Sequence, residues 1–169
     1  LDKDTSGLIM IARNEISHQE LARQMKERAI TKKYLSLTKG RLNPKEGSVE
    51  GPIGRDPRNR KRMVVLAGGR EARTLYRVLE YLGDFTLVEA SLVTGRTHQI
   101  RTHFSSIGHP IVGDSMYGGR SPLLQRQFLH AMELCFRHPR TGAPIQCVAP
   151  LPEDLKRVLA LLDRPSGQS

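Results

Sequence analysis

Two long strand-like runs separated by only two residues constrain the fold of this chain more than any other feature. Residues 72–82 and 85–93 are rich in β-branched, aromatic and leucine side chains, and Gly83 and Asp84 lie between them. A connection this short joins antiparallel neighbours, because a parallel pair needs a crossover of about a dozen residues or more. The sequence therefore predicts an antiparallel hairpin at the centre of the chain.

The rest of the chain continues the succession of short strands. Further strands are expected at residues 8–12, 32–38, 63–66, 127–136 and 143–148, and helices at residues 15–28 (capped by Asn14), 97–106 and 152–162. Residues 41–62 are expected to form an irregular or short-hairpin excursion, and residues 108–119 a loop. Because several strands follow one another without a helix between them, the fold class is α+β, with a mixed, mostly antiparallel β-sheet flanked by helices and loops.

The length of 169 residues suits one domain around a single core. We expect residues 1–163 to form that domain and residues 164–169 to be a flexible tail.

The balance of charge points to a polyanionic partner. Lys and Arg number 27 against 17 Asp and Glu, which gives a net charge of +10. Part of this charge is concentrated in one loop, at Arg55, Arg58, Arg60, Lys61 and Arg62. Such clustering is typical of contacts with nucleic-acid phosphates, so the loop is a candidate RNA-binding segment. Trp is absent and aromatic residues are few, which argues against a broad base-stacking platform.

Cysteine usage and hydropathy favour the cytoplasm. Cys135 and Cys147 lack partners at zinc-finger spacing and are expected to be buried small side chains in a reducing compartment. No apolar run approaches the roughly 20 residues of a membrane span, and no signal peptide is visible. We therefore expect a cytoplasmic protein with no membrane partner.

The opening stretch carries a candidate catalytic carboxylate. An acidic turn at residues 2–7 leads into the apolar run at residues 8–12, which is expected to be a buried strand that holds the turn rigidly. Rigid placement is what a catalytic group needs. We therefore predict that Asp2 is a nucleophile.

Three other interpretations compete for this stretch. A calcium loop of the EF-hand type needs a bidentate Glu at its twelfth position, where this chain has Arg13. A paired-aspartate phosphotransfer loop needs its Thr two residues after the second Asp, whereas Thr5 follows Asp4 directly. A hydrogen-bonded turn in which side chains cap local backbone amides is the favoured interpretation for residues 4–7.

A second dense motif lies at residues 92–103. It contains two arginines, two histidines and a glutamine at a strand-to-helix junction. Zinc binding by His98, His103 and His109 is disfavoured, because helix-borne ligands are normally three or four residues apart. Arg101 sits between apolar residues of the expected helix, which predicts a carboxylate partner for its guanidinium.

These motifs together resemble the RluA-type family of RNA pseudouridine synthases. The sequence segments LDKDTSGL at residues 1–8, KYLSL at residues 33–37 and TGRTHQIRTH at residues 94–103 occur in the family's order. The later segments GHPIVGD at residues 108–114 and LHA at residues 129–131 are also similar to the family. The likeness covers nearly the whole chain.

The resemblance implies the pseudouridine synthase fold and the isomerisation of uridine in structured RNA, ribosomal or transfer, without cofactor or metal. It assigns Asp2 as the nucleophile, Tyr34 as the aromatic side chain that packs on the target base, and Arg101 as the cation paired with Asp2. The side chains expected to shape the substrate site are those of Arg96, Thr97, His98 and Gln99. A guanidinium next to a carboxylate favours the charged form that this chemistry needs.

Two departures from the family pattern are expected to matter. The first motif normally begins with His-Arg before the leucine found here as Leu1, and many relatives carry an N-terminal RNA-binding module of the S4 type. The chain therefore resembles a catalytic domain that is incomplete at its N-terminus. A noncatalytic RNA-binding domain on the same fold is the alternative, and a phosphotransferase would need magnesium and a phosphorylated Asp2.

Overall fold

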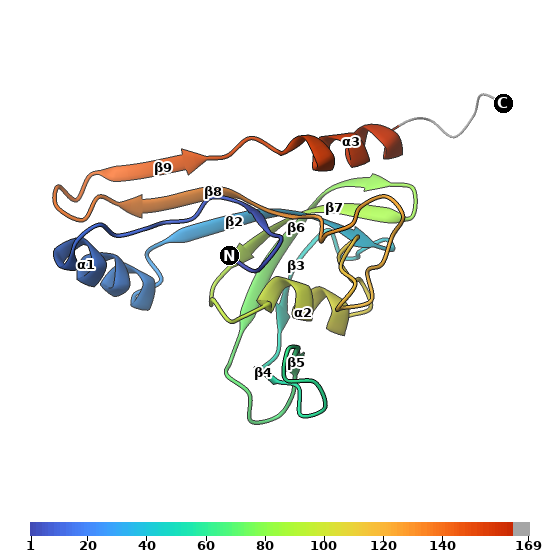
Figure 1. Ribbon diagram of the computed structural model, residues 1–169, viewed down its shortest axis with the longest axis horizontal. Coiled ribbons are helices and arrows are strands. Elements are labelled where there is room, and N and C mark those ends of the chain that lie inside the picture. Colours follow the sequence, from blue (N-terminus) through green and yellow to red (C-terminus); the bar gives the residue numbers. More distant parts are fainter. Residues whose placement is uncertain (164–169) are drawn as a thin grey trace.

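The computed structural model describes residues 1–163, which are built around a seven-stranded sheet. Its strands are β1 (Ser6–Gly7), β2 (Thr31–Lys39), β3 (Glu46–Glu50), β6 (Arg73–Leu82), β7 (Phe85–Leu92), β8 (Leu129–Arg137) and β9 (Pro144–Val148). The strand order is β1-β8-β2-β7-β6-β3, with β9 paired to β8 (Figure 1). Only the β1–β8 pair is parallel among these described strands. The predicted α+β class with a mixed, mostly antiparallel sheet is confirmed.

The central hairpin forms as the sequence predicts. Strands β6 and β7 pair from Thr74 with Leu92 to Leu82 with Phe85, and Gly83 in the connection has a φ of 59°. Glycine adopts this left-handed conformation without steric cost, which suits a two-residue turn. The predicted pairing of β8 with β9 is also confirmed.

The glycine- and proline-rich excursion is more ordered than expected. Strands β4 (Ile53–Arg55) and β5 (Met63–Val65) form the short hairpin that the sequence suggests. Strand β3, however, belongs to the main sheet and pairs along β6, where Val49 is buried. Strand β3 was not expected from the sequence, because its five residues include two glutamates and a glycine, which have low intrinsic strand propensity.

The apolar run at residues 8–12 is not the buried strand that was predicted. Ile9 and Ile11 are 65% and 75% exposed. Pairing of β1 with β8 ends at Gly7 and Ala131, and the same edge of β8 is occupied by β9 from Glu133 onward. The run therefore has no strand edge to pair with. The acidic turn is attached to the sheet by β1 instead.

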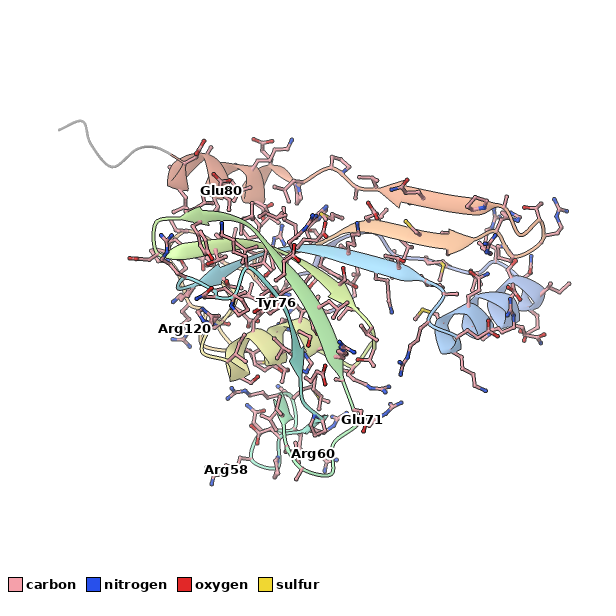
Figure 2. All side chains as sticks on the ribbon, turned by 180° about the vertical axis from the view of Figure 1, so that it is seen from behind. Arg58, Arg60, Glu71, Tyr76, Glu80 and Arg120 are labelled. Atoms are coloured by element: carbon pink, nitrogen blue, oxygen red, sulfur yellow. The ribbon has the colours of Figure 1, made fainter. Side chains whose placement is uncertain are left out.

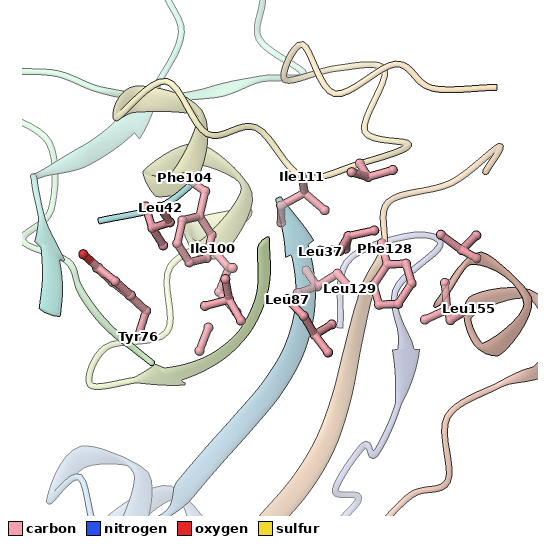
Figure 3. Close-up of a cluster of buried hydrophobic side chains, with 14 of the residues drawn as sticks. Leu37, Leu42, Tyr76, Leu87, Ile100, Phe104, Ile111, Phe128, Leu129 and Leu155 are labelled. Atoms are coloured by element: carbon pink, nitrogen blue, oxygen red, sulfur yellow. The ribbon is translucent and has the colours of Figure 1, made fainter. Parts of the chain in front are cut away.

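Three helices flank the described sheet: α1 (Glu15–Lys26), α2 (Gln99–Ser106) and α3 (Glu153–Leu162). Asn14 caps α1 as predicted, by accepting a hydrogen bond from the amide of Ser17. Helix α2 begins two residues later than expected and lies against one face of the sheet, near the N-terminus (Figure 1). Its Ile100 and Phe104 enter the core close to Tyr76, while Leu155 of α3 packs near Phe128 (Figure 3).

Other predictions have mixed outcomes. Cys135 and Cys147 are only half-buried and not buried as expected, since Cys147 lies on the edge strand β9 and Cys135 on the neighbouring strand β8. No helix within residues 1–163 is long and apolar enough to cross a membrane. The expected tail at residues 164–169 lies outside the described residues.

Candidate active site

The acidic turn and helix α2 meet at an ion pair. Oδ2 of Asp2 lies 3.3 Å from Nη1 of Arg101, although the two residues are 99 positions apart in the sequence. The Arg101 side chain is 7% exposed and that of Asp2 is 21% exposed. The carboxylate partner predicted for Arg101 is therefore present, and Asp2 remains accessible from one side.

Arg101 has a second and closer partner, Asp114, which was not expected from the sequence. Asp114 accepts hydrogen bonds from Nε of Arg101 at 2.6 Å and from Nη2 at 3.1 Å. Asp114 is buried, and its Oδ1 also accepts from the amides of Met116 and Tyr117. Burial alone would lower the pKa of Arg101, but hydrogen bonds and charge from Asp114, with a smaller effect of Asp2, raise it. The guanidinium is thus kept charged and fixed in orientation.

The turn itself is held by side chains from the segment before β8 and from β8. Nε2 of Gln127 donates to the carbonyl of Lys3 at 2.6 Å and to Oγ1 of Thr5 at 3.1 Å. Oγ of Ser6 lies 2.9 Å from Nδ1 of His130. The turn was expected to be stabilised by local side-chain bonds to backbone amides, whereas these side chains bond to residues more than a hundred positions away.

Tyr34 lies in the middle of the sheet, on β2, where it pairs with Ala90 of β7 and Ala131 of β8. The small alanine side chains leave space beside the tyrosine ring. Burial, together with the negative charge of Asp2, raises the pKa of the Tyr34 phenol. Tyr34 and Asp2 therefore share one environment, as the resemblance requires.

A cavity of about 540 Å³ joins these groups. Asp2, Tyr34 and His98 line it together with apolar side chains from the opening segment, α1, β7 and β8, which include Leu8, Met10, Met25, Leu92 and Leu129. This volume and mixed lining are typical of a small-ligand site.

The side chains of residues 96–99 have different roles. Gln99 is buried, and its amide accepts from Thr94 Oγ1 and the Arg96 amide and donates to the Arg73 carbonyl and Thr74 Oγ1. All four hydrogen-bonding positions of Gln99 are thereby used within the protein. Gln99 fixes the loop, while the exposed Thr97 and the half-buried Arg96 and His98 line the cavity.

Comparison with known proteins identifies the family of this chain. Residues 1–106 match the family model described as RNA pseudouridylate synthase. The chain belongs to this family.

Curated members of the family are close in sequence. The chain is 51% identical over 169 residues to an uncharacterised RNA pseudouridine synthase of Chloroflexus aurantiacus, and 46% identical over 168 residues to ribosomal large subunit pseudouridine synthase D of Nitrosomonas europaea. These alignments cover 98% and 94% of this chain but 53% and 48% of the relatives. The chain thus spans about half the length of the curated relatives it matches. The predicted RluA-type relationship is confirmed.

Solved structures agree on the fold. Human RNA pseudouridylate synthase domain containing 1 superposes with a TM-score of 0.77 at 30% identity, covering 97% of this chain and 78% of its own. Human RNA pseudouridylate synthase domain containing 4 gives a TM-score of 0.68 at 26% identity, over 86% and 66% of the two chains. The predicted pseudouridine synthase fold is therefore confirmed.

In this pseudouridylate synthase domain, the basic loop lies outside the cavity. Arg55, Arg58, Arg60 and Lys61 are exposed on the β4–β5 hairpin, where Arg58 and Arg60 project from the tip (Figure 2). Arg62 differs from them, since it is half-buried with its guanidinium 5.2 Å from the centre of the Tyr117 ring. The hairpin offers charge to a large ligand, not to a group inside the cavity.

The three candidate zinc ligands, His98, His103 and His109, bind different partners in the protein. His98 bonds to Tyr117, His103 to Thr74 and Gly51, and His109 to the Lys39 carbonyl. Across residues 1–163 no group of three or more His, Cys, Asp or Glu side chains is arranged to hold a metal ion. Each histidine therefore has a hydrogen-bonding role of its own.

Proposed function

We propose that this chain is the catalytic domain of an RNA pseudouridine synthase that isomerises uridine to pseudouridine in structured RNA. The observation that carries the proposal is the 3.3 Å contact between Asp2 and Arg101 at a cavity that Asp2 shares with Tyr34. Membership of the pseudouridylate synthase family supports it.

The reaction needs no atoms from outside the substrate. The N1–C1′ bond of uridine breaks, the uracil turns, and a C5–C1′ bond forms; C5 loses its proton and N1 gains one. Asp2 either attacks C1′ or assists the departure of uracil through its negative charge. In either case the fixed guanidinium of Arg101 orients the carboxylate, because Asp114 holds Arg101 from its other side.

The detached uracil must turn without escaping. The target nucleotide therefore has to leave its helix and enter an enclosed site. The Tyr34 ring and the apolar walls formed by Leu92 and Leu129 supply such an enclosure. We assign Tyr34 to packing against the uracil face, where an aromatic ring gives contact without fixing one orientation.

Ribosomal RNA is the substrate that we favour over transfer RNA. Relatives from Nitrosomonas europaea and Xanthomonas campestris, at 46% and 40% identity, are named ribosomal large subunit pseudouridine synthase D. Exposed arginines on the β4–β5 hairpin are suited to the phosphates of a folded RNA. The cytoplasmic location expected from the sequence remains a prediction.

The test is the formation of pseudouridine in transcribed ribosomal RNA incubated with the purified protein, measured by mass spectrometry of nucleosides. The proposal expects pseudouridine at a defined position. Tight RNA binding without any product, in ribosomal and transfer RNA alike, would favour the noncatalytic RNA-binding alternative. Mapping pseudouridines in RNA from cells with and without the gene then identifies the position.

A further inference from the structure

Tyr117 is a buried tyrosine that contacts Arg101 and His98 of the candidate site. It is 3% exposed, its amide donates to Asp114, and its ring centre lies 4.9 Å from the guanidinium carbon of Arg101. Its hydroxyl has two partners in the described protein: the amide of Met63 at 2.9 Å and Nδ1 of His98 at 2.9 Å. Tyr117 therefore links the basic hairpin, Arg101 and His98.

The Met63 amide fixes the direction of one hydrogen bond of the hydroxyl and favours one direction for the other. The Met63 amide can only donate, so the Tyr117 oxygen accepts that bond. A phenol carries a single proton, and Nδ1 of His98 is the one acceptor that residues 1–163 offer to it. If Nδ1 of His98 accepts, the buried phenol proton has a partner, whereas an Nδ1–H would leave that proton without one. This favours an Nδ1 that accepts and carries no proton. A neutral imidazole with a bare Nδ1 has its proton on Nε2.

The backbone of His98 is arranged to place this ring. His98 has a φ of 55°, a left-handed conformation that is uncommon for a residue with a side chain. It stands at the N-cap of α2 but makes no side-chain cap, so its imidazole is free to reach Tyr117. Its Nε2 has no partner within the described protein and is not among its buried unpaired atoms, while the residue lines the cavity. Strain of this kind is typically kept where function needs it.

We propose that Tyr117 holds His98 as a neutral imidazole whose Nε2–H donates a hydrogen bond to a carbonyl oxygen of the target uracil. This inference deepens the proposed function, and the catalytic role that it gives to His98 rests on that function. As the N1–C1′ bond breaks, negative charge develops on the uracil, including its carbonyl oxygens. A fixed donor in a site shielded from water stabilises such charge. His98 is then a catalytic residue and Tyr117 a positioning residue.

The surroundings of His98 favour the neutral form. Burial lowers the pKa of the imidazole below its ordinary value of 6.5. The charges of Asp2 and Asp114 raise the pKa of His98, and the charge of Arg101 lowers it further. The net effect is a lowered pKa. The lowered pKa favours the neutral ring that the hydrogen bonds of Tyr117 also favour.

The direct test is the tautomer of His98, read from long-range ¹H–¹⁵N spectra of histidine-labelled protein at pH 7, with the signal assigned by its loss in His98→Gln. We expect an unprotonated Nδ1 and a protonated Nε2. A protonated Nδ1, or an imidazolium, would overturn the inference. This spectrum does not depend on turnover, so it separates a failure here from a failure of the proposed function.

The role of Tyr117 is tested by Tyr117→Phe, which keeps the ring and removes the hydroxyl. We expect a mixture of His98 tautomers and a kcat roughly tenfold lower with little change in KM, by analogy with other orienting groups. Tyr81→Phe is the matched control, because the Tyr81 hydroxyl donates to the Leu42 carbonyl at 2.8 Å and its ring lies under Arg41, remote from the cavity lining. An unchanged tautomer and unchanged kcat in Tyr117→Phe would refute the positioning role.

A pair of substitutions at His98 tests the donor itself and does not require Tyr117→Phe to fold. The side-chain amide of Gln can reach the position of Nε2, whereas that of Asn reaches only the position of Nδ1. We expect His98→Gln to retain a kcat within roughly tenfold of the parent and His98→Asn to lose roughly a hundredfold, as for removal of an oxyanion donor. Equal losses in both variants would contradict the assignment of Nε2–H.

Discussion

Asp114 binds Arg101 through two hydrogen bonds, at 2.6 and 3.1 Å, whereas Asp2 binds it through one, at 3.3 Å. The buried Asp114 is thus the anchor of the guanidinium, and Asp2 occupies its remaining side. Under the proposed function, this division lets Asp2 react while its cationic partner stays in place. It also means that the site depends on a residue that has no direct part in the chemistry.

Asp114→Asn should therefore damage both stability and activity. The substitution leaves the buried Arg101 without its compensating charge, a situation that costs about 3 kcal/mol in comparable proteins. We expect the free energy of unfolding to fall by about that amount and kcat to fall more than tenfold, measured by urea denaturation and by pseudouridine formation.

A second aspartate that pairs with an arginine provides the control. Arg126 donates to Asp154 at 2.7 and 3.0 Å, but the Asp154 side chain is 43% exposed. Solvent screens such a pair, so Asp154→Asn should cost no more than about 1 kcal/mol and leave kcat unchanged. Similar losses in the two variants would contradict the distinct role of Asp114.

Tyr34 should act through its ring more than through its hydroxyl. We expect Tyr34→Ala to lower kcat/KM roughly a hundredfold, because stacking on a base is worth about 1–3 kcal/mol, and Tyr34→Phe to remain within roughly tenfold of the parent. Steady-state assays on one RNA transcript compare the two. If both variants lose activity equally, Tyr34 contributes chemistry through its hydroxyl and the packing role is wrong.

The exposed tip of the β4–β5 hairpin should contribute affinity but not chemistry. We expect the double substitution of Arg58 and Arg60 by Gln to weaken RNA binding and to reduce the slope of log affinity against log salt by about 0.7–0.9 for each lost phosphate contact. At saturating RNA, kcat should not change. Arg140→Gln, an exposed arginine in the turn between β8 and β9, is the control. An unchanged salt dependence in the double variant would remove the hairpin from the RNA interface.

The buried His103 should make the fold sensitive to mild acid. Burial lowers the pKa of His103 below the ordinary value of 6.5, against an opposing hydrogen bond to the Gly51 carbonyl. Between the folded and unfolded pKa values the unfolded chain binds more protons, so stability is complete above about pH 6.5 and is lost as the pH falls. We expect urea midpoints to drop from pH 7.5 to pH 5.5, and His103→Gln to reduce this drop. The exposed His18→Gln should leave it unchanged.

Local sequence signals predicted the elements whose formation depends on neighbours in the chain. The β6–β7 hairpin follows from two turn residues between strand-like runs, and α1 from its Asn14 cap. The same reasoning failed where two distant segments compete for one strand edge. Residues 8–12 look like a strand, yet the edge of β8 that they would need is taken by β9.

The site was predictable only in part for a related reason. Asp2, Tyr34 and Arg101 were named through motifs, and the geometry brings them together. Asp114 and Tyr117 lie in a segment correctly expected to be irregular, where periodicity gives no information on which side chains turn inward. Two signals could have led to Asp114: the expectation that Arg101 needs a carboxylate, and the family-like segment at residues 108–114, which ends in Asp114.

The most direct test of the central claim compares two neighbouring aspartates in a single-turnover assay with enzyme in excess over RNA. Asp2→Asn removes the charge next to Arg101. Asp4→Asn alters an exposed side chain instead, and Asn tolerates the backbone φ of 67° at this position. We predict no detectable pseudouridine with Asp2→Asn, at RNA affinity equal to the parent, and full activity with Asp4→Asn. Pseudouridine formation by Asp2→Asn at the parent rate would contradict the account.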